Sequence, residues 1–285
     1  MMTGLLFFLL FDERPRPLVP YTWAWSLHPS VLLGTGLLGA LYLWGIGPYR
    51  RRHGLGPPVE RWRVASFLGG LLVILLSLNG PLHDLSDYYL FSAHMLQHLL
   101  LTLLLPPLLI AGTPGWLLRP LLRHPSVLAV ARVLTKPVVA ATLYSVTIAA
   151  WHLAPYYDLM MRNHDVHVVT HLMFMVTATI MWWPVMSPAP ELPRLSPAPG
   201  MLYLFLVGLP MQLVAALITL SREVLYPWYA AAPRTFGLSP IDDQVSGGLL
   251  MWVPGNLWMF MAIGVLFFQW ARESEEQGGV VAKKA

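Results

Sequence analysis

The stretch FSAHMLQHLLLTLLLPPLLIAG, residues 91–112, decides how this chain folds. It is apolar enough to cross a bilayer as a helix, which takes about 20 residues. Yet it carries His94 and His98 in surroundings where an unpaired polar group is costly. Residues four apart project from one face of a helix, so the sequence predicts a two-imidazole face inside an apolar span.

The composition indicates an integral membrane protein in contact with the lipid bilayer. Of 285 residues, 56% are hydrophobic and 11% are charged, whereas soluble proteins have about 25% charged residues. The mean hydropathy is +0.58 and there are 12 Trp. We interpret the net charge of +4 as a topology signal and expect no nucleic-acid partner. The absence of cysteine excludes disulfides, thiolate metal sites and thiol catalysis, and leaves His, Met, Asp and Glu as ligands.

The hydropathy pattern predicts an all-α membrane protein, a bundle of about seven transmembrane helices in one membrane domain, residues 25–270. An outer interfacial segment, residues 1–24, precedes this domain, and a disordered cytoplasmic tail, residues 271–285, follows it. The predicted spans are 28–49, 63–80, 88–111, 137–153, 165–186, 200–220 and 244–270.

Lys and Arg residues predict the orientation of the bundle. With the N-terminus outside and the C-terminus in the cytoplasm, 13 of the 18 Lys and Arg residues fall on the inner side, as the positive-inside rule requires. The 13 are Arg50, Arg51, Arg52, Arg61, Arg63, Arg119, Arg123, Arg132, Lys136, Arg194, Arg272, Lys283 and Lys284.

Histidines gather on the opposite, outer side. The motif HVVTH places His167 and His171 on one face of the fifth span, just as HMLQH does on the third. Both spans run from outside to inside, so the two pairs lie at comparable depth and can face each other. We therefore predict a metal ion held between the two helices, with nearby carboxylates attracting the cation and orienting the rings. The predicted metal-site residues are His94, His98, His167, His171, His152, His164, Asp84, Asp87, Asp165 and Asp243. We interpret His28 and His83 as ordinary interfacial residues.

Copper is the metal that the donor types favour. Imidazole suits copper, zinc, iron and nickel, thioether groups nearby favour Cu(I), and Cu(II) has the highest affinity for nitrogen-rich sites. Zinc is the alternative metal.

Three rival functions fit the spacing less well. A b-type haem site takes its two imidazoles from opposite faces of the haem, and a four-residue spacing suits one small ion better. A zinc hydrolase of the HExxH kind needs Glu where this chain has Met95 and Val168. A transporter would continue polar groups through the inner halves of spans three and five, which are apolar. A metal-independent scaffold, in which the histidines clamp two helices together, stays open.

Two stretches, LHDLSDYYLFSAHMLQHLLLTLLLPPLLIAGTP and LSPIDDQVSGGLLMWVPGNLWMF, resemble the CtaG-type assembly factors of caa-type cytochrome c oxidase. The likeness covers nearly all of residues 25–270. It rests on the acidic loop before HMLQH, the WH pair at 151–152, HVVTH, and the DQ, GG and MW pairs of span seven.

The resemblance implies a multi-pass protein of the bacterial cell membrane that is not an enzyme. It implies a metallochaperone role, in which copper is delivered to or inserted into the catalytic subunit of a terminal oxidase from the outer side. Oligomeric state and the recipient protein stay open at this point.

Because imidazole must be neutral to bind a metal, we expect copper loading to weaken below about pH 6. Copper titrations of the detergent-purified protein at neutral and acidic pH measure this. An affinity that stays constant across that range would contradict imidazole ligation.

Overall fold

The computed structural model describes residues 21–23, 25–234 and 236–282, with side chains as far as residue 276. The described chain is helical, without strands, which confirms the all-α prediction. Of the interfacial segment predicted for residues 1–24, only residues 21–23 lie within the described ranges. The elements are α2 (Pro29–Trp44), η1 (Gly45–Tyr49), α3 (Arg50–His53), α4 (Arg61–Ser77), α5 (Gly80–Tyr88), α6 (Phe91–Leu99), η2 (Leu100–Leu104), α7 (Leu105–Gly112), α8 (Gly115–Leu122), α9 (Pro125–Leu134), α10 (Pro137–His152), α11 (Ala154–Arg162), α12 (His164–Met186), α13 (Pro197–Leu220), α14 (Pro227–Ala230) and α15 (Pro240–Ala282).

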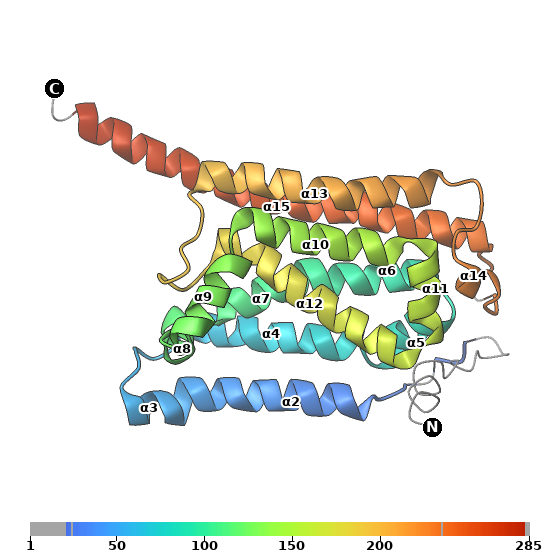
Figure 1. The fold of residues 1–285 in the computed structure, drawn as a ribbon, viewed down its shortest axis with the longest axis horizontal. Helices are drawn as coiled ribbons and strands as arrows, with labels where there is room; N and C mark the ends of the chain where they lie inside the picture. The colour runs from blue at the N-terminus through green and yellow to red at the C-terminus, as the bar shows by residue number, and fades with distance from the viewer. Residues whose placement is uncertain (1–20, 24, 235, 283–285) are drawn as a thin grey trace.

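Five to seven helical segments are long and apolar enough to cross a membrane. Five helices pass this test alone, and two bent pairs, α4 with α5 and α9 with α10, bring the total to seven. The five are Pro29–His53, Phe91–Gly112, His164–Met186, Pro197–Leu220 and Pro240–Glu276. Figure 1 shows the long helices running side by side along the long axis of the molecule. Each of the seven spans predicted from the sequence overlaps one of these segments.

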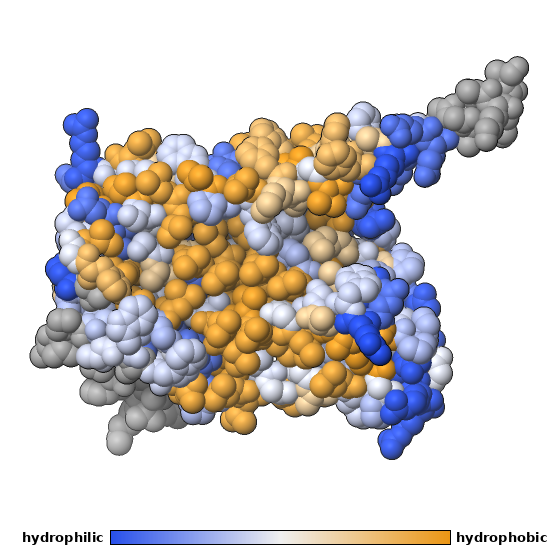
Figure 2. Space-filling view, turned by 180° about the vertical axis from the view of Figure 1, so that it is seen from behind, coloured by the Kyte–Doolittle hydropathy of each residue, from blue (hydrophilic) through white to orange (hydrophobic). Residues whose placement is uncertain are grey.

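The short helices lie at the two ends of this bundle (Figure 1). We call one the arginine end, which carries α3, α8 and α9, and the other the histidine end, which carries α5, α11 and α14. Figure 2 shows apolar side chains covering the middle of the bundle and hydrophilic ones at its ends. This arrangement matches a membrane protein whose arginine end faces the cytoplasm, as the positive-inside rule predicts.

Two segments differ from the sequence-based expectation. The acidic loop before the third span is the helix α5, which bends 48° away from α4. Gly80, at φ 63°, begins it in a conformation that glycine adopts at little cost. The tail after residue 270 is helical rather than disordered, because α15 continues to Ala282. Its Glu and Gln residues favour helix, which explains the continuation.

The third span contains a proline pair that would leave carbonyl groups without donors. Pro106 has no N–H, so the carbonyl of Thr102, four residues earlier, loses its usual helical donor. Trp182 of α12 replaces it, with Nε1 donating to the Thr102 oxygen at 3.1 Å. Between His98 and Pro106 the helix widens into the π turn η2, a distortion that often accompanies functional sites. The Trp182 bond ties α12 to this span and holds the two histidine helices in register.

Two adjacent glycines let α15 fit closely against α6 and α13. A Cβ atom on Gly247 would lie 2.4 Å from the ring of Phe91 on α6. A Cβ on Gly248 would lie 2.3 Å from Oγ1 and 2.9 Å from the backbone N of Thr219 on α13. Small residues allow such close helix approach within a membrane. The GG pair therefore positions α15 against the helix that carries His94.

We expect Gly248→Ala to destabilise the bundle by about 1–3 kcal/mol, because the added methyl group overpacks against the backbone of α13. Gly34→Ala is the matched control, since a Cβ there meets no atom within 4 Å. Thermal unfolding of both variants in detergent measures the difference. Equal unfolding temperatures would show that the α13–α15 contact tolerates a larger residue.

Candidate metal centre

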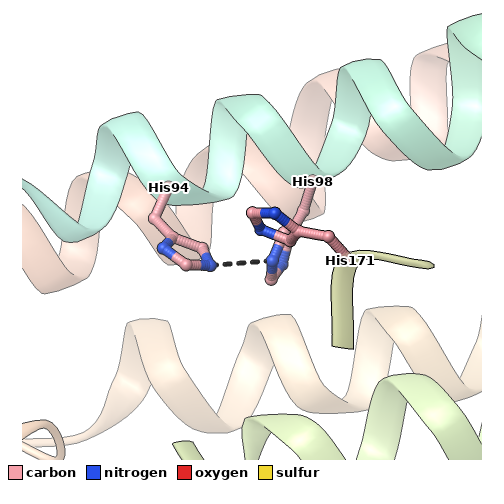
Figure 3. Close-up of side chains that lie close together, drawn as sticks. All are labelled: His94, His98 and His171. Atoms are coloured by element: carbon pink, nitrogen blue, oxygen red, sulfur yellow. Dashed lines mark hydrogen bonds between the residues drawn. The ribbon is translucent and has the colours of Figure 1, made fainter. Parts of the chain in front are cut away.

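The two HxxxH pairs face each other in the interior of the bundle. Within α6, His94 Nε2 and His98 Nε2 are 2.8 Å apart. Within α12, His167 Nε2 and His171 Nε2 are 3.1 Å apart. Across the two helices, the ring centroids of His94 and His167 are 5.4 Å apart, and those of His98 and His171 are 5.8 Å apart. Figure 3 shows His171 of α12 reaching toward His94 and His98 of α6.

These side chains form two overlapping groups that can hold a metal ion. One is His94, His98 and His171, and the other is Asp87, His94 and His167. In each group the ligand atoms lie within 4.8 Å of one another and every residue is buried. We call these five residues the buried cluster. A tetrahedral ion with bonds of 2.0–2.1 Å separates its ligand atoms by about 3.3 Å, so small ring movements would accommodate one.

Hydrogen bonds fix how His94 is oriented. Tyr229 of α14 donates its hydroxyl proton to the carbonyl of Ser86. The same hydroxyl oxygen lies 3.0 Å from His94 Nδ1, and the Ser86 oxygen lies 3.3 Å from it. Both neighbours accept a hydrogen bond from Nδ1–H, so the lone pair of the imidazole is on Nε2. That nitrogen points to His98, and metal-binding histidines are oriented by second partners in just this way.

Asp87 is one of two buried carboxylates in the described chain, with 2% of its surface exposed. Its Oδ2 lies 3.5 Å from His167 Nδ1 and 3.5 Å from His83 Nε2, and Ser86 donates to Oδ1. A carboxylate beside Nδ1 orients His167 so that Nε2 faces His171. Its negative charge, placed among imidazoles in a low-dielectric interior, also favours a cation there.

His152 extends the buried cluster from α10. Its Nδ1 donates to the carbonyl of Ile148 at 2.7 Å, and its ring centroid lies 5.5 Å from that of His98. His152 Nε2 and His98 Nδ1 are buried and find no hydrogen-bond partner in the described part of the chain. Such groups are rare in folded proteins and call for an explanation. A ligand bound beside them supplies one.

Besides His152 and Asp243, three further predicted site residues lie outside the buried cluster. His164 and Asp165, at the start of α12, are exposed. Asp84 is half-buried and accepts a hydrogen bond from Ser26. All three belong to the histidine end, closer to solvent than the buried cluster.

Asp243 caps the start of α6. Its carboxylate, fully buried, accepts hydrogen bonds from Phe91 N at 2.7 Å, Ser92 N at 3.0 Å and Ser92 Oγ at 2.6 Å. These are the first donors of α6, which no residue within that helix can satisfy. The negative charge also suits the positive end of the helix dipole. Asp243 therefore anchors the helix that carries His94, and we leave it out of the proposed ligand set.

Some residues of the centre carry no recognisable sequence signal. Tyr229 is more than 130 positions from His94 and belongs to a short helix, so no spacing connects the two. The sequence predicts an interfacial His83, but its side chain is buried, and its ring nitrogens lie close to Asp87 and Gln97. In a helix, residues four apart share a face, so a helical α5 would have predicted the contact between His83 and Asp87.

The fold and the centre together define a multi-span membrane protein with a buried histidine and carboxylate cluster near one end. The chain belongs to the cytochrome c oxidase caa3 assembly factor family (Caa3_CtaG), whose profile matches residues 40–273. The match includes every residue of the buried cluster.

Curated relatives are similar over most of the chain. The "Uncharacterized protein Mb0105" of Mycobacterium bovis is 28% identical, and the "Uncharacterized protein ML1998" of Mycobacterium leprae is 25% identical. Each alignment covers 92% of this chain but 42% of the relative, so the chain spans less than half of their length. No solved structure matches the chain.

We expect Asp243→Ala to lower the stability of the protein by about 1–3 kcal/mol, because it leaves the buried donors at the start of α6 unsatisfied. The matched control is Asp242→Ala, since Asp242 is the exposed neighbour and bonds to Ser239. Thermal unfolding in detergent compares the two. A loss for Asp242→Ala as large as that for Asp243→Ala would contradict the anchoring role.

Proposed function

We propose that this protein assembles a caa3-type cytochrome c oxidase by holding copper at the buried cluster and delivering it to the catalytic subunit. Delivery takes place at the outer side of the bacterial cell membrane, to which the histidine end belongs. The observation that carries the proposal is the convergence of His94, His98 and His171 from two helices, with ligand atoms within 4.8 Å of one another. Membership of the oxidase assembly family supports the choice of recipient.

The donor set supports copper. Imidazole nitrogens dominate it, one carboxylate stands beside them and the chain has no thiol. Copper has the highest affinity among divalent first-row metals for such nitrogen-rich sites, and Cu(I) also accepts imidazole. Zinc binds the same donors and is the second candidate. In either case Asp87 offsets one positive charge of the ion in an interior where uncompensated charge is costly.

The surroundings favour a carrier over a pore or a catalyst. Beyond His98 and toward the arginine end, the span continues with the buried apolar residues Leu101, Leu103 and Leu105. An ion in the buried cluster meets no further charged group along this span, so we infer that it returns to the histidine end. His94 belongs to both of the overlapping groups. A ligand shared in this way suits a carrier that must release its ion.

The packing disfavours a haem group. The His94 and His167 rings are nearly parallel, at 12°, with centroids 5.4 Å apart. A haem iron instead takes ring nitrogens that point at it from opposite sides of a wide macrocycle. Phe174 stands 4.5 Å from His98, ring to ring, and fills space that a macrocycle would need.

The proposal predicts that the wild-type protein retains copper after exposure and washing, whereas His94→Ala/His98→Ala retains at least about tenfold less, because two ligands are lost. Elemental analysis of the detergent-purified proteins measures this. His53→Ala/His124→Ala is the matched control, since both histidines are exposed and lie at the arginine end. Wild-type protein that retains neither copper nor zinc would leave the histidines as a structural clamp and contradict the proposal.

A further inference from the structure

A cavity of about 810 Å³ lies beside the buried cluster, and histidines line one part of it. Helices α2, α4, α7, α9 and α12 contribute to its walls, which are mostly apolar. Half of the histidines of the chain lie in these walls: His28, His83, His164, His167 and His171. Two of the five, His167 and His171, belong to the buried cluster, so the cavity reaches the candidate metal centre directly.

Three aromatic side chains in and just before α14 pack over the segments that carry the ligands. Trp228 Nε1 donates to the carbonyl of Asp87 at 2.7 Å, Tyr229 bonds to Ser86, and the hydroxyl of Tyr226 donates to the carbonyl of His152 at 3.0 Å. Each of these three aromatic side chains is 2% exposed. These side chains are therefore buried and hydrogen-bonded, whereas the cavity beside His167 and His171 offers space next to the buried cluster.

His28 lines the part of the cavity that is close to solvent. It is half-buried, and its backbone N donates to Asn79 Oδ1 at 2.7 Å, which fixes its position just before α2. Its Nε2 is buried and finds no hydrogen-bond partner within the described residues. The ring of His83 is 4.4 Å away, centroid to centroid. A buried, unsatisfied imidazole nitrogen beside a second imidazole is chemically suited to take up a soft or borderline cation.

A chain of short steps connects this pair to the buried cluster. His83 Nε2 lies 3.5 Å from Asp87 Oδ2, and the same oxygen lies 3.5 Å from His167 Nδ1. Ligand bonds of about 2.0–2.1 Å let two donors up to about 4 Å apart share one ion. At each step the ion can therefore bind the next ligand before it leaves the previous one.

We propose that His28 and His83 form an outer loading site for the copper ion, and that the ion passes from this site into the buried cluster, where Asp87 is the first ligand that it meets. The proposal rests on the function proposed above and adds the path and the first ligands. Transfer is an exchange of imidazole and carboxylate ligands, in which the oxidation state of the ion does not change. The exposed His164 lies at the mouth of this path and belongs to the same cavity wall.

The test separates loading rate from final occupancy in the full chain, purified in detergent. Copper(I) is supplied as a complex with a coloured chelator, whose absorbance change gives the rate of transfer and the copper bound at the end. We expect His28→Gln/His83→Gln to load at least about tenfold more slowly, which corresponds to about 1.4 kcal/mol in the barrier. At saturating copper it reaches the wild-type copper content, because the five residues of the buried cluster are unchanged. His53→Gln/His124→Gln is the matched control and loads at the wild-type rate.

A second pair of variants keeps every histidine. Gly34 lines the cavity and Gly36 does not, and a Cβ on either meets no atom within 4 Å. We expect Gly34→Phe to fill part of the cavity and slow loading, whereas Gly36→Phe leaves the rate unchanged. The two glycine variants test the path even if the double histidine variant folds poorly. Thermal unfolding checks the folding of every variant.

The outcomes distinguish the path from the function. If the wild type takes up copper and both His28→Gln/His83→Gln and Gly34→Phe load at its rate, the loading path is wrong and the proposed function stands. If the double variant loses final copper content in step with the buried-cluster variant, His28 and His83 are ligands of the resting site and the path is again wrong. If the wild type takes up no copper, both proposals fail.

Discussion

Polar groups buried inside an apolar bundle must be satisfied within the protein, because lipid offers no hydrogen bonds. This constraint shapes the whole histidine end. Six histidines and two carboxylates are buried there, whereas every Lys and Arg in the described chain keeps some exposure. Asp243 is satisfied by the start of α6, and Asp87 lies among imidazoles. An ion bound at the buried cluster would give a partner to His98 Nδ1, which finds none within the described residues.

The contacts that hold the helices in place are separate from the imidazoles of the buried cluster. The Gly247–Gly248 contacts, the Asp243 anchor and the Trp182 bond to Thr102 set the positions of α6, α12 and α15. None of these contacts involves an imidazole of the buried cluster. Functional sites held on rigid elements keep their geometry within fractions of an ångström. The π turn that follows His98 is a local irregularity within this support, at the place where the histidine face ends.

Sequence reasoning found the spans and the two facing HxxxH pairs, because helical period and hydropathy are local properties of the chain. It could not assign roles that depend on contacts between distant segments. Asp243 belongs to an acidic pair near the outer surface, and only the packing of α15 on α6 shows that it anchors a helix. Tyr229 was missed for the same reason, whereas His83 was missed because its segment was not expected to be helical. The helical state of α5 went unrecognised because Gly80 and Pro81 read as loop residues.

The central claim is that imidazoles from α6 and α12 hold one copper ion together. Copper K-edge X-ray absorption of the loaded protein tests it most directly, because it reports the ligand atoms and their distances. The account predicts three or four nitrogen or oxygen ligands at about 2.0 Å with imidazole scattering, and the loss of one imidazole in His171→Ala. Copper without imidazole scattering, or a spectrum unchanged by His171→Ala, would contradict it.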